Sequence, residues 1–283
     1  MIAFDGKTLK RSYISSDDKM SALDSVTVWS KDNGLILAQA RSKGKKNENK
    51  TVLEFIELLE IKNAMITADA INCQKKIADK IRSKQADYVL PIKENHKLFL
   101  EEIEDYFNWM KQSHPETTAQ YTFTQTDSGH GRIETRRCIQ LKIHELTPQA
   151  SQWKDCATVT EITRIRELKN NTQTQIEYYI RSLATNLEQI ADAIRSHWEV
   201  ENKGYWVLDV VYKEDESRIR RENAAENIAV ARRFALNLAR LHPQKNSMRG
   251  KLKQAMWSDQ MRHEIICAEN LNKVLFCPVK DMK

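Results

Sequence analysis

The sequence TNLEQIADAIRSHWEVENKGYWVLDVVYKEDE, from Thr185 to Glu216, has apolar residues at the spacing of one face of an amphipathic helix. Thr185 and Glu188 have the spacing of a capping box, which predicts that the helix begins at this point. We therefore expect a long helix whose apolar face packs against the rest of the fold. The residues on that face are Leu187, Ile190, Ala191, Ile194, Trp198, Tyr205 and Leu208.

Glu201 falls on the same face as these apolar residues. It lies seven residues after Ile194 and three after Trp198, whereas Glu199 is rotated by about 140° from Ile194 and is expected to face solvent. A carboxylate that points toward a core needs a partner, because burial of an unpaired charge is costly. The partner of Glu201 is therefore a metal ion, a basic side chain or a proton.

The composition is that of a globular protein with reduced cysteines. The chain has 283 residues, of which 41% are hydrophobic, enough to fill the core of one large domain or two ordinary ones. The five cysteines show neither C-x-x-C pairing nor the spacing of a metal finger, which predicts free thiols and a cytoplasmic location. We expect no targeting leader and no membrane span, because the sequence has no apolar run of about 18 residues.

Positive charge is concentrated toward the C-terminal end. The net charge of the chain is +6, yet residues 218–253 contain ten basic and two acidic residues, a local balance of +8. Such a stretch can follow the phosphate backbone of a nucleic acid. It can equally be the charged face of a surface helix, since the helical period places Arg232 and Arg233 away from the apolar side.

The N-terminal part of the chain predicts a mixed sheet covered by helices. Asn33-Gly34 joins two β-type runs and is the strongest short signal for a hairpin. Pro91 indicates that the strand containing it lies at an edge or ends there. The order of three strands, helix, strand, helix and strand favours an α/β fold. The expected strands are residues 1–5, 25–30, 35–40, 64–70 and 87–93, and the expected helices are residues 51–61 and a segment with Ile77, Ala78 and Ile81.

A β-rich subdomain is expected between this first part and the helix that contains Glu201. A helical period over residues 94–111 precedes four β-type runs between residues 120 and 183. Residues 222–241 are rich in Ala and Leu without a breaker, which predicts a helix, and a further helix is expected at 247–256. The expected organisation is residues 1–93 as the first part of the core, 94–183 as a helix and the β-rich insertion, 184–241 as the completion of the core, and 242–283 as a C-terminal tail.

Three acids are placed where separate elements could present them to one point beside the sheet. Asp5 ends the first strand, Asp69 ends the fourth, and Glu201 lies on the helix. A few carboxylates suffice to hold Mg²⁺, and two such ions support phosphodiester chemistry. An aspartate at the end of a strand is also a common turn or cap residue, so the pattern alone leaves both interpretations open.

Four segments carry a distinctive set of motifs, among them HGRIETRR and HW-x-x-EN-x-x-x-W-x-LDV. In their order, from Met1 to about Leu241, they resemble the H-repeat-associated, ISAs-type DDE transposases of bacterial insertion sequences. The segments are IAFDGKTLKRS, ITADAINCQKKIADKIRSKQADYVLPIKENH, DSGHGRIETRR and IRSHWEVENKGYWVLDVVYKEDESRIRRENAAENIAVARRFALNL.

The resemblance implies a ribonuclease H-like fold with a β-rich insertion before the last catalytic helix. It implies that Asp5, Asp69 and Glu201 form the catalytic DDE triad and bind Mg²⁺, with Mn²⁺ as the alternative ion. The implied activity is cleavage of double-stranded DNA at the ends of an insertion sequence and transfer of the freed 3′ hydroxyl to target DNA. The resemblance also allows a homodimer in the DNA complex.

Departures from the family pattern predict an N-terminally shortened copy. Relatives carry a segment before the first catalytic strand, whereas Asp5 is the fifth residue here. Residues 47–51 read NENKT where relatives commonly read SNEIT. In the broader group of related transposases, the helix that carries the catalytic glutamate has Tyr, Arg and Lys at three fixed positions. This chain has Ile194, His197 and Leu208 at those positions. The alternative is therefore a catalytically inactive remnant that retains only DNA binding.

Basic residues in the motifs are candidates for contact with DNA. Arg and His in a Gly-flanked turn suit the positioning of phosphates, although an ordinary solvated hairpin has the same composition. Basic residues on the glutamate helix could replace the missing phosphate-handling residues. Trp198 is expected in the core because it shares the face of Glu201. The candidates are His130, Arg132, Arg136, Arg195, His197 and Lys203.

Overall fold

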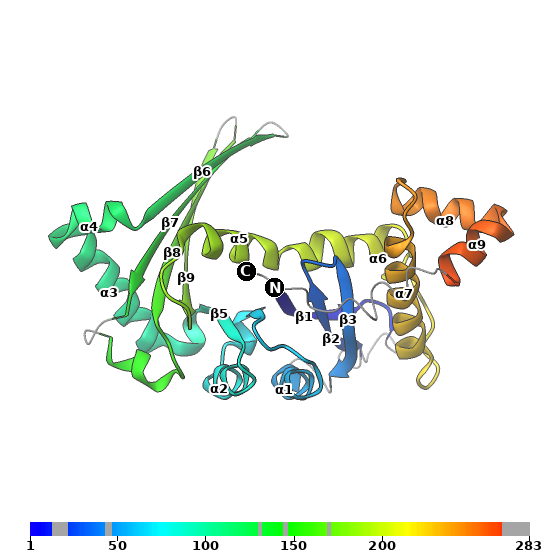
Figure 1. Cartoon of the computed structure of the whole chain (residues 1–283), viewed down its shortest axis with the longest axis horizontal. Helices are drawn as coiled ribbons and strands as arrows, with labels where there is room; N and C mark the ends of the chain where they lie inside the picture. The colour runs from blue at the N-terminus through cyan, green and yellow to red at the C-terminus, as the bar shows by residue number, and fades with distance from the viewer. Residues whose placement is uncertain (13–21, 43–46, 130–131, 144–146, 169–170, 268–283) are drawn as a thin grey trace. The chain divides into compact units, whose positions relative to one another are not determined.

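The computed structural model describes residues 1–12, 22–42, 47–129, 132–143, 147–168 and 171–267 (Figure 1). The chain divides into two units. The first comprises Met1–Gly6 and Lys45–Trp198, and the second comprises Lys7–Gly44 and Glu199–Lys283. Strand β1 (Ile2–Leu9) contributes residues to both units.

The first unit is built on parallel strands that are extended by a long antiparallel ladder. Strand β4 pairs in parallel with both β1 and β5, and β5 pairs antiparallel with β9. Strands β9, β8, β7 and β6 then follow as successive antiparallel neighbours. These strands are β4 (Met65–Ala68), β5 (Asp87–Ile92), β6 (Thr122–Gly129), β7 (Arg132–Lys142), β8 (Thr158–Leu168) and β9 (Asn171–Arg181).

Helices cover both faces of the parallel strands. Helices α1 and α2 lie on one face and α5 on the other (Figure 1). On the α5 side, Ile190 and Ile194 pack with Val89, Cys138 and Ile162 in a buried cluster. The helices of this unit are α1 (Glu48–Leu58), α2 (Lys75–Ser83), α3 (Lys97–Ser113), α4 (Pro115–Gln120) and α5 (Leu187–His197), with short 3-10 turns at Ala70–Asn72, Glu94–His96 and Pro148–Gln152.

The second unit packs a hairpin against a helix. Strands β2 (Leu23–Ser30) and β3 (Leu35–Ser42) are antiparallel, and Gly34 has a φ of +63° in the turn between them. The Asn237 side chain accepts from Ile36 N at 3.0 Å and donates to Ile36 O at 2.7 Å, so it pairs with the backbone of β3. The other elements are a π-helix at Val200–Tyr205, α6 (Trp206–Val210), α7 (Ala224–Leu241), α8 (Met248–Trp257) and α9 (Asp259–Ile266).

The strand order confirms the predicted fold class. The nine strands are ordered β3-β2-β1-β4-β5-β9-β8-β7-β6. The first five positions form the ribonuclease H-like sheet, and β6 to β9 are the β-rich insertion. No helix among the described residues has the length and apolar composition needed to cross a membrane.

Most elements predicted from periodicity are present, with a few differences. Pro91 pairs with Tyr179 of β9, one residue before β5 ends and beyond the last β4 partner, Val89. The second of the two interpretations of Pro91, a strand end, is therefore confirmed. Helices α4 and α9 were not predicted. Both are short, with six and eight residues, so they contain little periodic signal.

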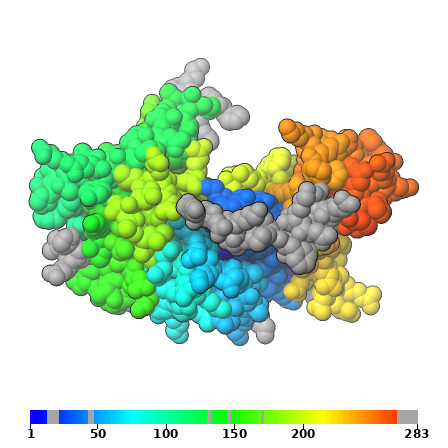
Figure 2. Space-filling view, viewed as in Figure 1, coloured from blue at the N-terminus to red at the C-terminus, as the bar shows by residue number. Residues whose placement is uncertain are grey.

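Helices α8 and α9 are the orange to red segments of Figure 2.

The prediction that Glu201 lies on a buried apolar face is wrong. Helix α5 begins after Asn186, whose side chain accepts a hydrogen bond from Gln189 N, so Thr185 is not the N-cap. Val200–Tyr205 is a π-helix rather than an α-helix. A π-turn has more than 3.6 residues, so positions counted at 100° per residue shift around the axis. Glu201 is consequently exposed.

The same change of period affects the neighbours of Glu201. Tyr205 and Leu208 are buried, as predicted, and Val200, which was not placed on the apolar face, is buried as well. Trp198, which was expected in the core, is 42% exposed, and its ring lies 5.6 Å from the Arg164 guanidinium. Glu199 is only partly exposed, contrary to the expectation that it faces solvent. The sequence period thus described α5 and the burial of Tyr205 and Leu208 correctly, and it failed for Trp198, Glu199 and Glu201.

Several residues of the basic stretch are structural. Arg233 was expected to point away from the apolar side, but it is buried and forms an ion pair with Glu214 at 2.6 Å. Lys251 is also buried and donates to the carbonyls of Ala239 and His242 at 2.8 and 2.7 Å. These contacts complete the carbonyls at the end of α7. Neither cation is available to contact a phosphate backbone.

Among the described residues, the cysteines are free thiols, as predicted. Burial raises the pKa of Cys138 to about 12 and that of Cys156 to about 12, and it also raises the pKa of Cys73. We expect these three thiols of the native protein to resist Ellman's reagent at pH 8, because only the thiolate reacts. Exposed Cys267 should react within minutes.

The measurement is mass spectrometry of the labelled protein, carried out on a Cys277→Ser variant so that Cys267 is the only expected site. A Cys267→Ser change in that background should abolish rapid labelling. Rapid labelling of Cys138 under native conditions would contradict the burial described above.

Candidate metal centre

Two aspartates meet because their strands are parallel neighbours. The register pairs Ala3 with Thr67 and Phe4 with Ala68, so the next positions along the two strands are Asp5 and Asp69. Side chains alternate along a strand, which places Asp5, Thr67 and Asp69 on one face of the sheet. Asp5 is buried, and the Asp69 side chain is 48% exposed. The sequence predicted that Asp5, Asp69 and Glu201 meet at one point beside the sheet, with Asp5 at the end of the first strand. The geometry brings Asp5 and Asp69 together, but Asp5 lies inside β1, which continues to Leu9.

His197 joins the two aspartates from helix α5. Helix α5 packs on β4, and His197 is its last residue. The ring nitrogen Nε2 lies 3.2 Å from Asp69 Oδ1, and Nδ1 lies 2.9 Å from Thr67 Oγ1. Asp5, Asp69 and His197 each offer one ligand atom, and these atoms lie within 4.8 Å of one another.

The surroundings of Asp69 favour its ionised form. Burial is the largest influence and would raise the pKa of Asp69, but hydrogen bonds with His197 and Asp5 and the charges of His197 and Lys93 outweigh it. The pKa of Asp69 is therefore below its usual value. A carboxylate at the end of β4 that stays ionised beside a second carboxyl group is suited to bind a cation.

The donor set fits a small divalent ion. Two carboxyl groups are hard oxygen donors of the kind that Mg²⁺ and Mn²⁺ accept, and the remaining positions of such an ion are usually filled by water and substrate phosphate. An imidazole beside two carboxylates is compatible with Mn²⁺ as well. The centre therefore fits the ions expected from the sequence.

Gly6 sits between the cluster and helix α1. Because side chains alternate along β1, position 6 faces the opposite side from Asp5. A Cβ atom at Gly6 would lie 2.7 Å from Glu48 Oε1 and 2.8 Å from Oε2. Glu48 is buried at the start of α1. Glycine is thus required after Asp5 because a buried carboxylate occupies the space of a side chain.

We expect Gly6→Ala to lower the thermal midpoint by about 3–6 °C, since overpacking a buried site costs about 1–2 kcal/mol. Gly129→Ala is the matched control, because a Cβ there would meet nothing within 4 Å. In a Glu48→Ala background the effect of Gly6→Ala should largely disappear. Thermal unfolding is monitored by circular dichroism. An equal fall of the thermal midpoint in both backgrounds would show that Glu48 does not obstruct the added methyl group.

The remaining predicted site residues lie in three different settings. Glu201 is exposed in the second unit, and Lys203 pairs with Glu199 at 2.9 Å. Arg136 and Arg195 are brought together by one carboxylate, since Asp127 Oδ2 lies 2.9 Å from Arg136 and 3.2 Å from Arg195. His130 lies outside the described residues. Arg132 begins β7, and the structure describes only its backbone.

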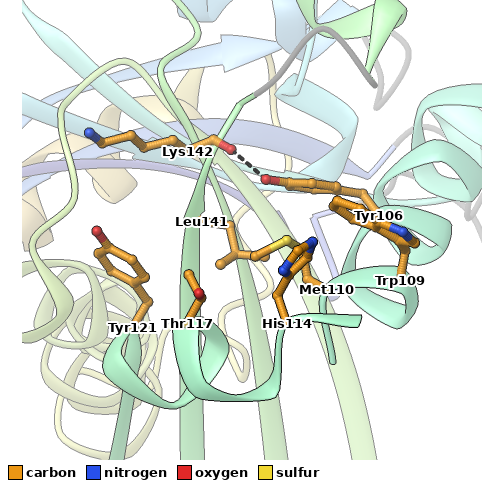
Figure 3. Close-up of a pocket in the computed structure, with 8 residues that line it drawn as sticks. All are labelled: Tyr106, Trp109, Met110, His114, Thr117, Tyr121, Leu141 and Lys142. Carbon is orange, nitrogen blue, oxygen red and sulfur yellow. Dashed lines mark hydrogen bonds between the residues drawn. The ribbon is translucent and has the colours of Figure 1, made fainter. Parts of the chain in front are cut away.

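A cavity of about 330 Å³ lies apart from these residues, between α3, α4 and the end of β7 (Figure 3). The Tyr106 hydroxyl donates to Lys142 O at 3.0 Å, and the Tyr106 and Trp109 rings are stacked. None of the lining residues belongs to the acidic cluster, so the cavity is not part of the candidate metal centre. They are Tyr106, Trp109, Met110, His114, Thr117, Tyr121, Leu141 and Lys142.

Sequence reasoning assigned His197 to DNA and did not single out Thr67. The available signal was the alternation of Thr67 and Asp69 in the run ITADA, which places a hydroxyl and a carboxylate on one face. Nothing in the periodicity indicated that the last turn of α5 would lie against that face. That contact depends on how the helix packs on the sheet.

The fold and this cluster define a ribonuclease H-like protein with an acidic centre on one face of its parallel strands. The chain belongs to the family described as the transposase DDE domain, whose family model matches residues 2–238. The resemblance to H-repeat-associated transposases is confirmed by the relatives that the chain matches.

Three proteins of Escherichia coli illustrate the similarity. "Putative transposase YncI" of strain O157:H7 is 37% identical over 253 residues, which cover 85% of this chain and 62% of that protein. "H repeat-associated putative transposase YhhI" of strain K12 is 35% identical over 243 residues, covering 84% and 63%. "Putative protein YbfL" of strain K12 is 36% identical over 243 residues, which cover 84% of this chain and 63% of that protein. The chain thus spans less than two thirds of the length of these relatives.

A solved structure is also similar to the chain. It is the cryo-EM structure of the piggyBac transposase synaptic complex with hairpin DNA, with a TM-score of 0.44 and 13% identity over 98% of this chain and 54% of that chain. Similarity at this level is too low to support an argument about the site.

Proposed function

We propose that this chain is a metal-dependent DNA transposase that cleaves DNA at the ends of an insertion sequence and transfers the freed 3′ hydroxyl to target DNA. The observation that carries the proposal is the meeting of Asp5, within β1, and Asp69, directly after β4, on one face of two adjacent parallel strands, with His197 beside them. Membership of the DDE transposase family supports the same conclusion.

The proposed ligands of the ion are Asp5, Asp69 and Glu201. Asp5 and Asp69 are supported by their geometry, and Glu201 by its place in the HW-x-x-EN motif. The chemistry supplied by Mg²⁺ or Mn²⁺ at such a site is activation of the attacking oxygen and stabilisation of the leaving oxygen. Hydrogen bonds with His197 and Asp5 outweigh burial and lower the pKa of Asp69, which favours its ionised form.

The proposed partner is double-stranded DNA, with a homodimer in the DNA complex. Arg136 and Arg195 are proposed to contact phosphates together, because both reach the Asp127 carboxylate from different elements. A phosphate could replace Asp127 as their shared anion. His130, Arg132 and Lys203 are further proposed contacts on the basis of the motifs alone.

The test is a cleavage assay on duplex DNA that carries the inverted repeats flanking the gene. We expect nicks at the repeat ends in Mg²⁺ or Mn²⁺ and none in EDTA. Glu201→Gln should reduce the rate by about 100-fold or more, because loss of one carboxylate removes several kcal/mol of stabilisation. Glu199→Gln is the matched control on the neighbouring turn and should retain cleavage. Full activity of Glu201→Gln would refute the assignment of that residue.

The alternative function is DNA binding by an inactive remnant. It is favoured by Ile194, His197 and Leu208, which occupy positions of Tyr, Arg and Lys in related transposases. This alternative predicts salt-sensitive binding to DNA that Asp5→Asn leaves unchanged, with no cleavage in either ion. Metal-dependent cleavage that Asp5→Asn abolishes would reject it.

A further inference from the structure

We propose that His197 is a positioning residue, which holds Asp69 through an N–H group and is not itself a metal ligand. The inference rests on the proposed function, because it names the role of one residue in the same metal centre. It changes the role expected for His197 from the sequence, which was contact with DNA. The decisive observation is that both nitrogens of the ring have partners.

The ring is fixed from two directions by residues of one strand and its end. Thr67 is buried, and its hydroxyl lies 2.9 Å from His197 Nδ1. Asp69 lies two residues later, and its Oδ1 is 3.2 Å from Nε2. Thr67 and Asp69 share a face of the sheet, so the ring spans the distance between two successive side chains on that face.

The partners determine where the proton resides. Asp69 presents its carboxylate oxygen Oδ1 to Nε2 at 3.2 Å, and a carboxylate oxygen accepts hydrogen bonds. Nε2 must therefore carry a proton toward Asp69. In a neutral ring Nδ1 then has a lone pair, and the Thr67 hydroxyl donates to it. In a charged ring both nitrogens carry protons, and Thr67 accepts instead.

In either protonation state, Nε2 is not free to bind a metal. A nitrogen that binds a metal offers its lone pair, which Nε2 lacks while it donates to Asp69. The Nδ1 lone pair is directed at a hydroxyl on the strand. The arrangement instead matches that of an outer partner, a residue that does not bind the metal but whose hydrogen bond fixes the orientation of a ligating carboxylate. With Oδ1 engaged by the ring, Oδ2 is the Asp69 oxygen that would remain to bind an ion.

The competing interpretation makes His197 the third ligand. Its Nε2 is close enough, since the ligand atoms of Asp5, Asp69 and His197 lie within 4.8 Å of one another. That interpretation requires Nε2 to lose its proton and the bond to Asp69 to break. The two roles therefore predict opposite protonation of one nitrogen when metal is present.

The first experiment is a long-range proton–nitrogen NMR correlation on ¹⁵N-histidine-labelled full-length protein, with His197→Gln used to assign the ring. We expect the His197 signals to show a protonated Nε2 both in the metal-free protein and after saturation with Mg²⁺. A neutral ring with the proton on Nδ1, or loss of the Nε2 proton when Mg²⁺ is added, would overturn the proposal.

The second experiment measures affinity for Mn²⁺ by electron paramagnetic resonance. We expect His197→Ala to weaken binding by about 10–100-fold, the usual effect of removing an outer partner. His197→Gln places an amide N–H near the position of Nε2 and should restore binding to within about fivefold of the natural protein. Thr67→Ser should bind Mn²⁺ normally, whereas Thr67→Val should bind more weakly. Equal loss in the Ala and Gln variants would contradict a role based on the N–H group.

The two experiments separate this inference from the proposed function. Absence of Mn²⁺ binding by the natural protein would refute the metal centre, while the NMR signals would still report which nitrogen faces Asp69. Conversely, normal cleavage and Mn²⁺ binding by His197→Ala would refute the positioning role and leave the transposase proposal intact. Asp5→Asn should abolish Mn²⁺ binding. That loss would show that the measured ion occupies this centre.

Discussion

Asp69→Cys is expected to lose strand cleavage in Mg²⁺ by about 10³-fold and to recover part of it in Mn²⁺. Loss of a metal-ligating carboxylate removes about 4 kcal/mol of transition-state stabilisation at 1.36 kcal/mol for each factor of ten. Mg²⁺ prefers hard oxygen donors, whereas a thiolate is a softer donor that Mn²⁺ accepts more readily. A recovery of about tenfold or more in Mn²⁺ would identify Asp69 as a direct ligand.

The control for this change lies on the nearby helix α2. Asp79 is an exposed aspartate in the same unit and lies outside the acidic cluster. Asp79→Cys introduces the same side chain and should cleave DNA normally in both ions. The measurement is the initial rate of nicking across a range of Mg²⁺ and Mn²⁺ concentrations. Full cleavage by Asp69→Cys in Mg²⁺ would rule out Asp69 as a ligand.

The local sequence predicted the parts of the site that depend on strands. The positions of Asp5 and Asp69 follow from two short apolar runs, and the parallel pairing of β1 with β4 brings these positions together. A buried strand is read directly from a run of apolar residues. Its end is harder to predict, since the first strand was expected to end at Asp5 and β1 continues to Leu9. The fold class could be predicted for the same reason, since the order of elements restricts how they can pair.

The parts that depend on helix packing could not be predicted in the same way. The face of Glu201 was calculated from 3.6 residues per turn, and the π-helix at Val200–Tyr205 invalidates that count. His197 reaches Asp69 only because α5 ends where it crosses β4. The His197 contact depends on the packing of α5 on β4, which leaves no period in the sequence. The role of Glu201 therefore remains a prediction from its motif.

The burial of Arg233 was missed for a related reason. Helix α7 has a clear apolar face, and an arginine beside it is normally solvated. Here the side chain reaches Glu214, which is fully buried, and also donates to Ala229 O at 3.1 Å. Lys7 lies 3.2 Å from the same Glu214 carboxylate. The charge of Arg233 is tolerated on the apolar face because Glu214, nineteen positions earlier in the chain, pairs with it.

Arg233→Met is expected to destabilise the second unit by about 3 kcal/mol. Removing one partner of a buried ion pair typically costs about 3–5 kcal/mol, because the other charge stays buried without compensation. The lower end applies here, since Lys7 still lies beside Glu214 after the change. The readout is hydrogen exchange of the α7 amides by mass spectrometry, which reports opening of this unit without assuming that the whole chain unfolds together. Exchange should accelerate by about 100-fold, as 1.4 kcal/mol corresponds to a factor of ten.

Two variants decide whether the ion pair is the cause. Arg221→Met removes a cation that is almost fully exposed and should leave the exchange of α7 unchanged. Arg233→Met combined with Glu214→Leu removes both charges, and an apolar pair in their place is often as stable as the ion pair. The double variant should therefore exchange more slowly than Arg233→Met alone. If the double variant exchanges faster than Arg233→Met alone, the stabilising contribution comes from the contact of Glu214 with Lys7 and not from its ion pair with Arg233. The fold would then tolerate the buried arginine without requiring it.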